Sequence, residues 1–309
     1  MTAPAPGGSA VTVPQGHASV MTELRSAVSP DGTPIGYTRT GDGPGLVIVP
    51  GNNRMAHNYA RLASELADRF AVSVLERRGR GASGAQGPAY CLDREIEDVQ
   101  TVQRAERARL VFGHSYGGLI ALQSARTDRS LDRVAVYEPA VSLNGSFDLS
   151  FLPEFERLLA AGRHARAMAL FLQRTRRTPL PDATPRFVFQ VLAALMVRGK
   201  SGAEMRDLMP TTPPELSEVL RCDSDGAGYA EVTARTLLIG GTKTPTYLTG
   251  VLDPLSRIIL DSHVEMLEGA DHNAPDENSP HVVAECLAAF LDDEVAGSPP
   301  ATPTRRRLH

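Results

Sequence analysis

The sequence predicts an α/β fold in which helices cover both faces of a mostly parallel sheet. Short apolar runs of strand length alternate along the chain with longer segments whose apolar residues recur every three or four positions. Parallel neighbouring strands need a long crossover connection, and a helix supplies it. The chain has 309 residues, of which 42% are hydrophobic and 22% charged, so it can form the large core that such a fold needs.

The first elements build one end of this sheet. Residues 26–41 predict a hairpin that turns at Pro30-Asp31-Gly32. The apolar runs 45–50 (GLVIVP) and 71–76 (AVSVLE) are typical of strands that are buried on both faces. Between them, apolar residues form one helical stripe at positions 59, 62, 63, 66 and 70.

The alternation continues to the end of the chain. Ile96, Val99 and Val102 recur every third residue and predict a helix. The last helix is expected to begin at Pro280 with Ser279 as its cap, because proline suits the first helical position and serine the N-cap. Four further strands are predicted at 108–113, 133–138, 235–240 and 263–268.

Residues 145–228 interrupt the pattern, because they hold apolar helical stretches with no buried strand between them. We expect them to form an all-helical cap, inserted after the sixth strand of a core made of residues 22–144 and 229–294. Residues 1–21 and the basic stretch 295–309 are expected to be disordered tails. The cap's large apolar residues suggest as a group a largely apolar substrate, although each by itself is better explained by core packing: Phe151, Leu152, Phe155, Met168, Phe171, Phe187, Phe189 and Met196.

Composition excludes several classes of protein. The net charge of −4 gives no nucleic-acid signature, and no window is long and apolar enough to span a bilayer. The first twenty residues lack the basic and apolar regions of a secretory signal. Cys91, Cys222 and Cys286 lie far apart without metal-ligand spacing, as expected of reduced thiols. These observations predict a soluble, cytoplasmic protein without a metal, a nucleic-acid partner or a membrane partner.

Residues 111–118 (VFGHSYGG) carry the strongest chemical signal. Ser115 directly follows a predicted strand and precedes a predicted helix, with Gly113 and Gly117 two positions to either side. A sharp strand-to-helix turn needs such minimal neighbours, and it presents the serine hydroxyl above the sheet at a helix N-terminus. The alternative is a serine in a glycine-rich turn, which the flanking strand and helix disfavour.

In this context the motif resembles the nucleophile elbow of the α/β-hydrolase family, and the resemblance covers roughly residues 22–292. Residues 47–55 lie where the family has its His-Gly oxyanion loop, with Pro50 in place of the histidine. Residues 76–83 (ERRGRGAS) are similar to the family's Asp-x-Arg-Gly-x-Gly-x-Ser loop, with Glu76 in place of the aspartate. Neither change removes a backbone N–H that catalysis would need.

The resemblance implies an oxyanion hole of two backbone N–H groups. Tyr116, directly after the nucleophile, supplies one. The second is expected from Asn52, with Asn53 as the neighbour that could replace it. Two asparagines in a polar turn remain the alternative explanation.

His272 is the histidine expected to act as the base. It follows the last predicted strand in the stretch GADHN, which is similar to the family's ending with histidine in that loop. An imidazole with an ordinary pKa near 6.5 is largely neutral at pH 7 and can take the serine proton.

The acid of the triad is less evident. Most of the family places it after the strand at 235–240, but the loop 240–248 contains no carboxylate. Glu138 ends the preceding strand at the sheet edge where strand tips converge, and a subset of the family places its acid there. Pro139 is expected to leave Glu138 at the rim of the sheet, where pairing with an arginine would be its alternative role. Asp253 is the second candidate for the acid.

We therefore expect a serine hydrolase that cleaves an ester, thioester or lactone of a small molecule through an acyl-enzyme on Ser115, without a cofactor. Carbon–carbon bond hydrolysis, acyl transfer and a cyclisation are alternatives on the same scaffold. A non-catalytic binder of a small ligand is a further one. The apolar cap helices could also contact a second subunit in a homodimer.

Overall fold

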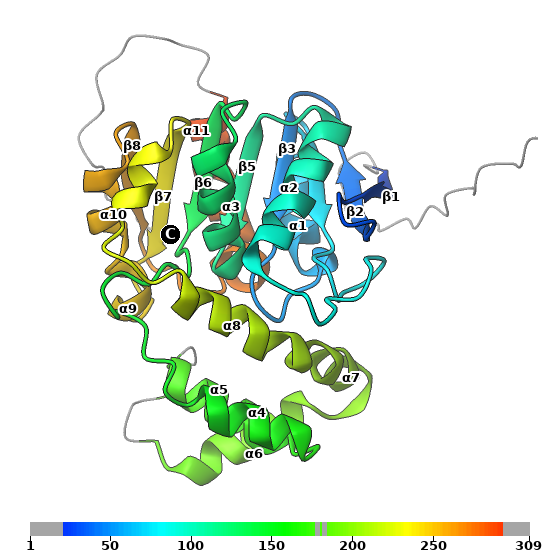
Figure 1. Cartoon of the computed structure of the whole chain (residues 1–309), viewed down its shortest axis with the longest axis vertical. Coiled ribbons are helices and arrows are strands. Elements are labelled where there is room, and N and C mark those ends of the chain that lie inside the picture. The colour runs from blue at the N-terminus through cyan, green and yellow to red at the C-terminus, as the bar shows by residue number, and fades with distance from the viewer. Residues whose placement is uncertain (1–20, 177–179, 181–183, 293–309) are drawn as a thin grey trace, which may run out of the picture.

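The computed structural model describes residues 21–176, 180 and 184–292. Apart from Met21, both predicted tails lie outside the described residues. The described chain forms one sheet with eight strands (Figure 1). The strands are β1 Thr22–Val28, β2 Pro34–Thr40, β3 Gly45–Val49, β4 Ala71–Leu75, β5 Leu110–His114, β6 Arg133–Tyr137, β7 Arg235–Gly241 and β8 Ser262–Leu267.

The strands lie in the order β1-β2-β4-β3-β5-β6-β7-β8. The hairpin of β1 and β2 is antiparallel, and β2 pairs antiparallel with β4. Every pair from β4 across to β8 is parallel. The predicted mostly parallel sheet is therefore confirmed, and the carboxyl ends of β3, β5, β6, β7 and β8 meet at one edge.

Helices cover both faces of the sheet. The helices are α1 Ala60–Leu66, α2 Leu92–Glu106, α3 Tyr116–Thr127, α4 Leu152–Ala160, α5 His164–Thr175, α6 Arg186–Met196, α7 Gly199–Leu208, α8 Thr212–Arg221, α9 Thr246–Thr249, α10 Leu252–Ile258 and α11 Pro280–Leu291. None of the described helices is both long and apolar enough to cross a membrane.

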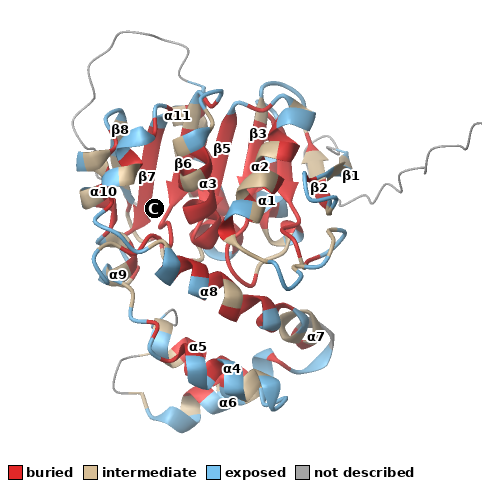
Figure 2. Cartoon of the chain, viewed as in Figure 1, coloured by how far each residue is buried: buried red, intermediate tan, exposed pale blue. Residues whose placement is uncertain are grey.

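The core follows the two-residue period of the strands. In β3, Val47 and Val49 pack into the cluster beneath α2 and α3, whereas Leu46 and Ile48 pack into the cluster beneath α1 and α11. β5 and β6 divide their side chains in the same way. Figure 2 shows that the central strands are buried, while β1 at the edge is more exposed. Two-sided burial explains why these strands are continuous apolar runs.

Helices α4 to α8, here called the helical segment, stand between β6 and β7 in the chain. In Figure 1 they gather below the lower edge of the sheet, with α8 nearest to it and α6 far from it. Phe151, Phe155 and Phe171 pack against one another inside this segment, with ring centroids 5.9 to 6.3 Å apart. Phe187 and Met196 are exposed.

Two local expectations need correction. Ser279 occupies the N-cap position of α11, but its side chain makes no capping hydrogen bond. The rim position expected of Glu138, because Pro139 follows it, is wrong, since its side chain is completely buried. The physical reason is that both carboxylate oxygens have hydrogen-bonding partners inside the fold, as described below. The bounds of the six strands from β3 to β8 differ from the predicted ones by no more than two residues, whereas β1 begins four residues before the predicted hairpin.

Candidate active site

Ser115 lies in the turn between β5 and α3, with φ 54° and ψ −117°. This left-handed backbone is costly for a residue with a side chain, and it is typical of a functional turn held by its surroundings. The Ser115 carbonyl accepts hydrogen bonds from the N–H groups of Gly118 (2.9 Å), Leu119 (3.2 Å) and Ala140 (2.9 Å). The hydroxyl is therefore presented at the N-terminus of α3, where the helix dipole is positive.

The two glycines of the motif are required by close backbone packing. A Cβ atom at Gly113 would lie 2.3 Å from the carbonyl oxygen of Gly117. A Cβ atom at Gly117 would lie 2.0 Å from the carbonyl oxygen of Val49 in β3. No side chain fits at either position, so these glycines allow β3, β5 and α3 to meet at the turn.

Glu138 and His272 form a buried pair. Glu138 follows β6 with φ 45°, and His272 lies in the loop after β8. His272 Nδ1 lies 2.6 Å from Glu138 Oε2, and Glu138 Oε1 accepts the Gly241 N–H at 2.8 Å. Glu138 is 0% exposed and His272 3% exposed. An ionised carboxylate only accepts hydrogen bonds, so Nδ1 is the donor in this pair.

His114, inside the motif, connects the turn to the His272 loop. His114 Nε2 lies 2.8 Å from the His272 carbonyl oxygen, and the two rings lie 4.9 Å apart. Because a carbonyl only accepts, Nε2 is the donor in this bond, and Nδ1 lies 2.7 Å from the Tyr59 hydroxyl. The Tyr59 hydroxyl accepts in turn the Gly51 N–H at 3.0 Å. His272 and the loop of Gly51 are thus held from the same histidine beside Ser115.

The loop after β3 (residues 50–54, here called the Gly51 loop) contains the predicted oxyanion residues. Asn52 and Asn53 form a turn and are 6% and 7% exposed, so this turn is buried. Asn53 has φ 56°, and its Nδ2 donates to Asn52 Oδ1 at 2.8 Å. Within the described part of the chain, no hydrogen bond is donated by the backbone N–H of Asn52 or of Tyr116.

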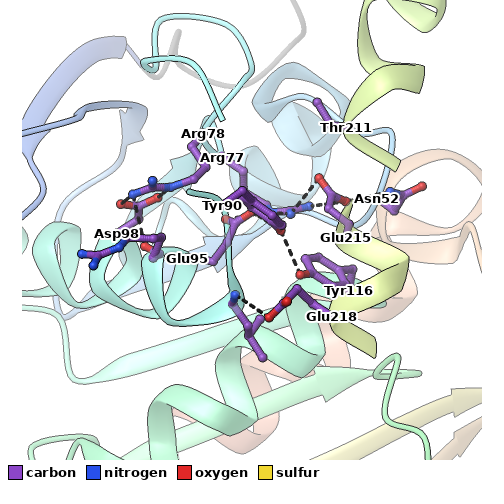
Figure 3. A network of polar contacts seen from close by, with 12 residues as sticks. Asn52, Arg77, Arg78, Tyr90, Glu95, Asp98, Tyr116, Thr211, Glu215 and Glu218 are labelled. Atoms are coloured by element: carbon purple, nitrogen blue, oxygen red, sulfur yellow. Dashed lines mark hydrogen bonds and ion pairs between the residues drawn. The ribbon is translucent and has the colours of Figure 1, made fainter. Parts of the chain in front are cut away.

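A network of buried charges lies beside this loop (Figure 3). Arg77 donates to Glu95 Oε1 at 2.6 Å and lies 3.0 Å from Glu215 Oε1, and all three side chains are at most 1% exposed. Burial alone would lower the Arg77 pKa, but Glu215 and Glu95 raise it, and the result lies well above the ordinary value. Burial alone would raise the Glu95 pKa, but Arg77 lowers it, and it ends below its usual range. These charges are fixed as ion pairs.

The structure does not bring the second acid candidate to this place. Asp253 lies on α10, as the sequence suggested, and is exposed. The structure pairs His272 with Glu138 instead. Within the described residues, no three His, Cys, Asp or Glu side chains gather as a metal site would require.

Sequence reasoning misses three residues of this site. The pattern marks His114 only as a variable position of the motif, places Tyr59 in an apolar stripe and gives Glu215 no role. His114 has a usable signal, because it is a polar side chain directly before the predicted nucleophile. Glu215 has none, since a carboxylate on an amphipathic helix usually faces solvent.

Comparisons with known proteins agree with this architecture. The family model described as "Alpha/beta hydrolase family" matches residues 46–286. The 2-(acetamidomethylene)succinate hydrolase of Mesorhizobium japonicum is 25% identical over 264 residues, which cover 82% of this chain and 89% of that protein.

Solved structures show the same likeness. An α/β hydrolase from Sphaerobacter thermophilus has a TM-score of 0.73 and 29% identity, covering 86% of this chain and 100% of that one. An esterase from a Rhodococcus species, at 20% identity, shares the fold with a TM-score of 0.64 over 87% of this chain and 98% of that one. From the matched family model, the sheet order and the turn at Ser115, we conclude that this chain belongs to the α/β-hydrolase family.

Proposed function

We propose that this protein is a serine hydrolase that cleaves a small ester, thioester or lactone through an acyl-enzyme on Ser115. The observation that carries the proposal is the buried pair of Glu138 and His272, 2.6 Å apart, in loops at the same sheet edge as the Ser115 turn. The relative from Mesorhizobium is named as a hydrolase, and an esterase shares the fold. Both support hydrolysis, and neither specifies the substrate.

In the first half of the proposed reaction, Ser115 is the nucleophile. Glu138 holds the Nδ1 proton of His272, so Nε2 can take the Ser115 Oγ proton as the oxygen attacks the carbonyl carbon. The carbonyl oxygen becomes an oxyanion, which accepts hydrogen bonds from the Asn52 and Tyr116 N–H groups at the N-terminus of α3. His272 then returns the proton to the leaving oxygen or sulfur, and the acyl group stays on Ser115.

Water completes the proposed reaction. His272 takes a proton from water as its oxygen attacks the acyl carbon, and the same amides stabilise the second oxyanion. His272 then protonates Ser115 Oγ, and the carboxylic acid leaves. The helical segment, which the sequence predicted as a cap, is proposed to cover this site. The largely apolar substrate stays a prediction, since the aromatic residues Phe151, Phe155 and Phe171 pack against one another.

A fluorophosphonate probe at pH 8 tests the proposal, because it forms a stable adduct only with an activated serine. We expect the wild type to be labelled and Ser115→Ala not to be. Ser124→Ala is the matched control, since Ser124 is buried on the same helix α3 and should keep full labelling. An unlabelled wild type would reject the proposal and favour ligand binding without catalysis. A series of p-nitrophenyl esters of increasing chain length would then define the acyl group.

A further inference from the structure

We propose that Glu215, on helix α8, is a positioning residue that holds both backbone amides of the oxyanion site. The inference rests on the function proposed above, since it concerns how the same site is held in shape. Glu215 is 0% exposed and belongs to the helical segment between β6 and β7. Its carboxylate contacts Asn52 directly. It also contacts Arg77, whose guanidinium lies over the Tyr116 ring.

The contacts to the Gly51 loop form a closed set of hydrogen bonds. Asn52 Nδ2 donates to Glu215 Oε2 at 2.7 Å, and Asn53 Nδ2 donates to Asn52 Oδ1 at 2.8 Å. The hydroxyl of Thr212, three residues before Glu215 on α8, donates to Asn53 Oδ1 at 2.9 Å. Thr212 and Glu215, one helical turn apart on α8, thus bind the side chains of two consecutive asparagines. These bonds fix the side chains of Asn52 and Asn53 and thereby restrict the backbone of the loop.

The contacts to the Ser115 turn pass through Arg77. The Arg77 guanidinium lies 3.0 Å from Glu215 Oε1 and 4.6 Å from the centroid of the Tyr116 ring. It also donates to the Gly51 carbonyl oxygen at 3.3 Å. The Tyr116 hydroxyl lies 2.9 Å from that of Tyr90, which donates to Glu95 (Figure 3). Tyr116 is therefore held by its ring and its hydroxyl, which fixes the residue whose amide is proposed to bind the oxyanion.

Charge makes this arrangement hard to alter. Arg77, Arg80, Glu95 and Glu215 carry two positive and two negative charges, and their side chains are 0% or 1% exposed. Arg80 pairs with Glu215, and its Nε and Nη1 atoms have no hydrogen-bond partner among the described residues. Burial and the charge of Arg77 lower the Arg80 pKa. Moving α8 away would leave both arginines without this carboxylate, which is strongly unfavourable for buried charges.

It follows that the position of α8 and the shape of the oxyanion site are coupled. When α8 lies against the core, Glu215 contacts both Asn52 and Arg77, so the loop and the Ser115 turn are held together. When α8 is displaced, the loop loses its side-chain anchors although every residue of the proposed triad is still present. Glu215 does not touch the substrate in this scheme, so its effect is expected on kcat rather than on substrate binding.

The experiment compares Glu215→Gln with Glu218→Gln. Glu218 is the matched control, because it is a largely buried carboxylate one turn further along α8 that accepts the Leu92 N–H at 2.8 Å. Leu92 and Arg221, which donate hydrogen bonds to it, lie outside the Gly51 loop. Glu215→Asp serves as a second Glu215 variant, since it keeps the charge but shortens the side chain and should fold where Glu215→Gln does not.

Two measurements are needed. For a p-nitrophenyl ester, we expect kcat of both Glu215 variants to fall about 10- to 100-fold, up to the lower limit for the loss of one oxyanion donor, with KM within about threefold of wild type. Glu218→Gln should keep both constants within about twofold. Hydrogen–deuterium exchange of the Gly51 loop amides should accelerate at least fivefold in the Glu215 variants, but not in Glu218→Gln.

The exchange measurement separates the two proposals. If the wild type neither turns over esters nor reacts with a fluorophosphonate, the proposed function fails, while faster exchange of the Gly51 loop still supports Glu215 as its anchor. If Glu215 and Glu218 variants lose activity only in parallel with folded protein, and the loop exchanges as in wild type, Glu215 has no positioning role. Equal kcat losses in Glu215→Asp and Glu218→Gln would also overturn it.

Discussion

Replacing Glu138 by Gln should lower kcat about 10⁴-fold, as amide replacement of the buried acid does in a Ser-His-Asp triad. The structure gives the reason. A glutamine side chain has one acceptor and one donor group where Glu138 has two acceptors. The Gly241 N–H, 2.8 Å from Oε1, requires the acceptor on its side. The NH₂ group of the introduced amide therefore faces His272 Nδ1, where the original distance is 2.6 Å.

This orientation reverses the tautomer of His272. Nδ1 must accept a hydrogen bond, so the proton moves to Nε2, and the ring cannot take the Ser115 proton. A 10⁴-fold loss corresponds to about 5.4 kcal/mol of transition-state stabilisation at about 1.36 kcal/mol per factor of ten. The opposite orientation of the amide would place NH₂ against the Gly241 N–H, two donors in contact inside the core.

The assay is steady-state hydrolysis of a p-nitrophenyl ester, with thermal unfolding to confirm that the variant is folded. Asp253→Asn is the control, because Asp253 is exposed on α10, and its kcat should stay within about twofold. If folded Glu138→Gln keeps more than a tenth of the wild-type kcat, or if Asp253→Asn loses more activity than Glu138→Gln, the assignment of the acid is wrong.

Three further predictions concern the framework of the site. Gly117→Ala should destabilise the fold by about 3 kcal/mol or more in chemical denaturation, because the new Cβ would lie 2.0 Å from the Val49 carbonyl oxygen and both atoms belong to packed backbone. Glu76→Gln should raise the melting temperature at pH 8 and lose this advantage towards pH 4. Burial raises the Glu76 pKa, so the folded state is penalised once pH exceeds the unfolded pKa, whereas below it Glu76 is protonated in both states. Tyr59→Phe should lower the free energy of unfolding by about 1–3 kcal/mol, because His114 loses the buried hydroxyl group that it contacts.

Each of these has a result that would contradict it. A Gly117→Ala protein with wild-type stability would mean that β3 and α3 can separate at the turn. A Glu76→Gln protein that is less stable than wild type at pH 8 would mean that the ionised Glu76 side chain stabilises the folded state. Tyr59→Phe with unchanged stability would mean that water replaces the hydroxyl.

The strands, the sharp turn at Ser115 and the pairing of Glu138 with the loop of His272 could be predicted from the sequence. Gly113 and Gly117 predict close backbone packing at the turn, because a residue with a side chain does not fit at either position. Glu138 could be found because parallel strands end at one edge, and the next loop lacks a carboxylate. Its complete burial could not be found, since that depends on the Gly241 N–H, 103 positions away. The hydrogen bond between Asn52 and Glu215 joins residues 163 positions apart, and no local sequence pattern predicts it.

The residues that follow β6, 138–140, determine where this protein could be joined to helices from a relative. Glu138 is followed by Pro139 and by Ala140, whose N–H donates to the Ser115 carbonyl, so the first residues leading to the helical segment are also part of the turn's framework. A chimera that takes its helices from a relative should therefore be joined after Ala140, not at the end of the strand. It would also need a carboxylate on the last grafted helix to meet Asn52 and Arg77. An exchange of these helices between relatives would therefore have to include the carboxylate that binds Asn52 and Arg77.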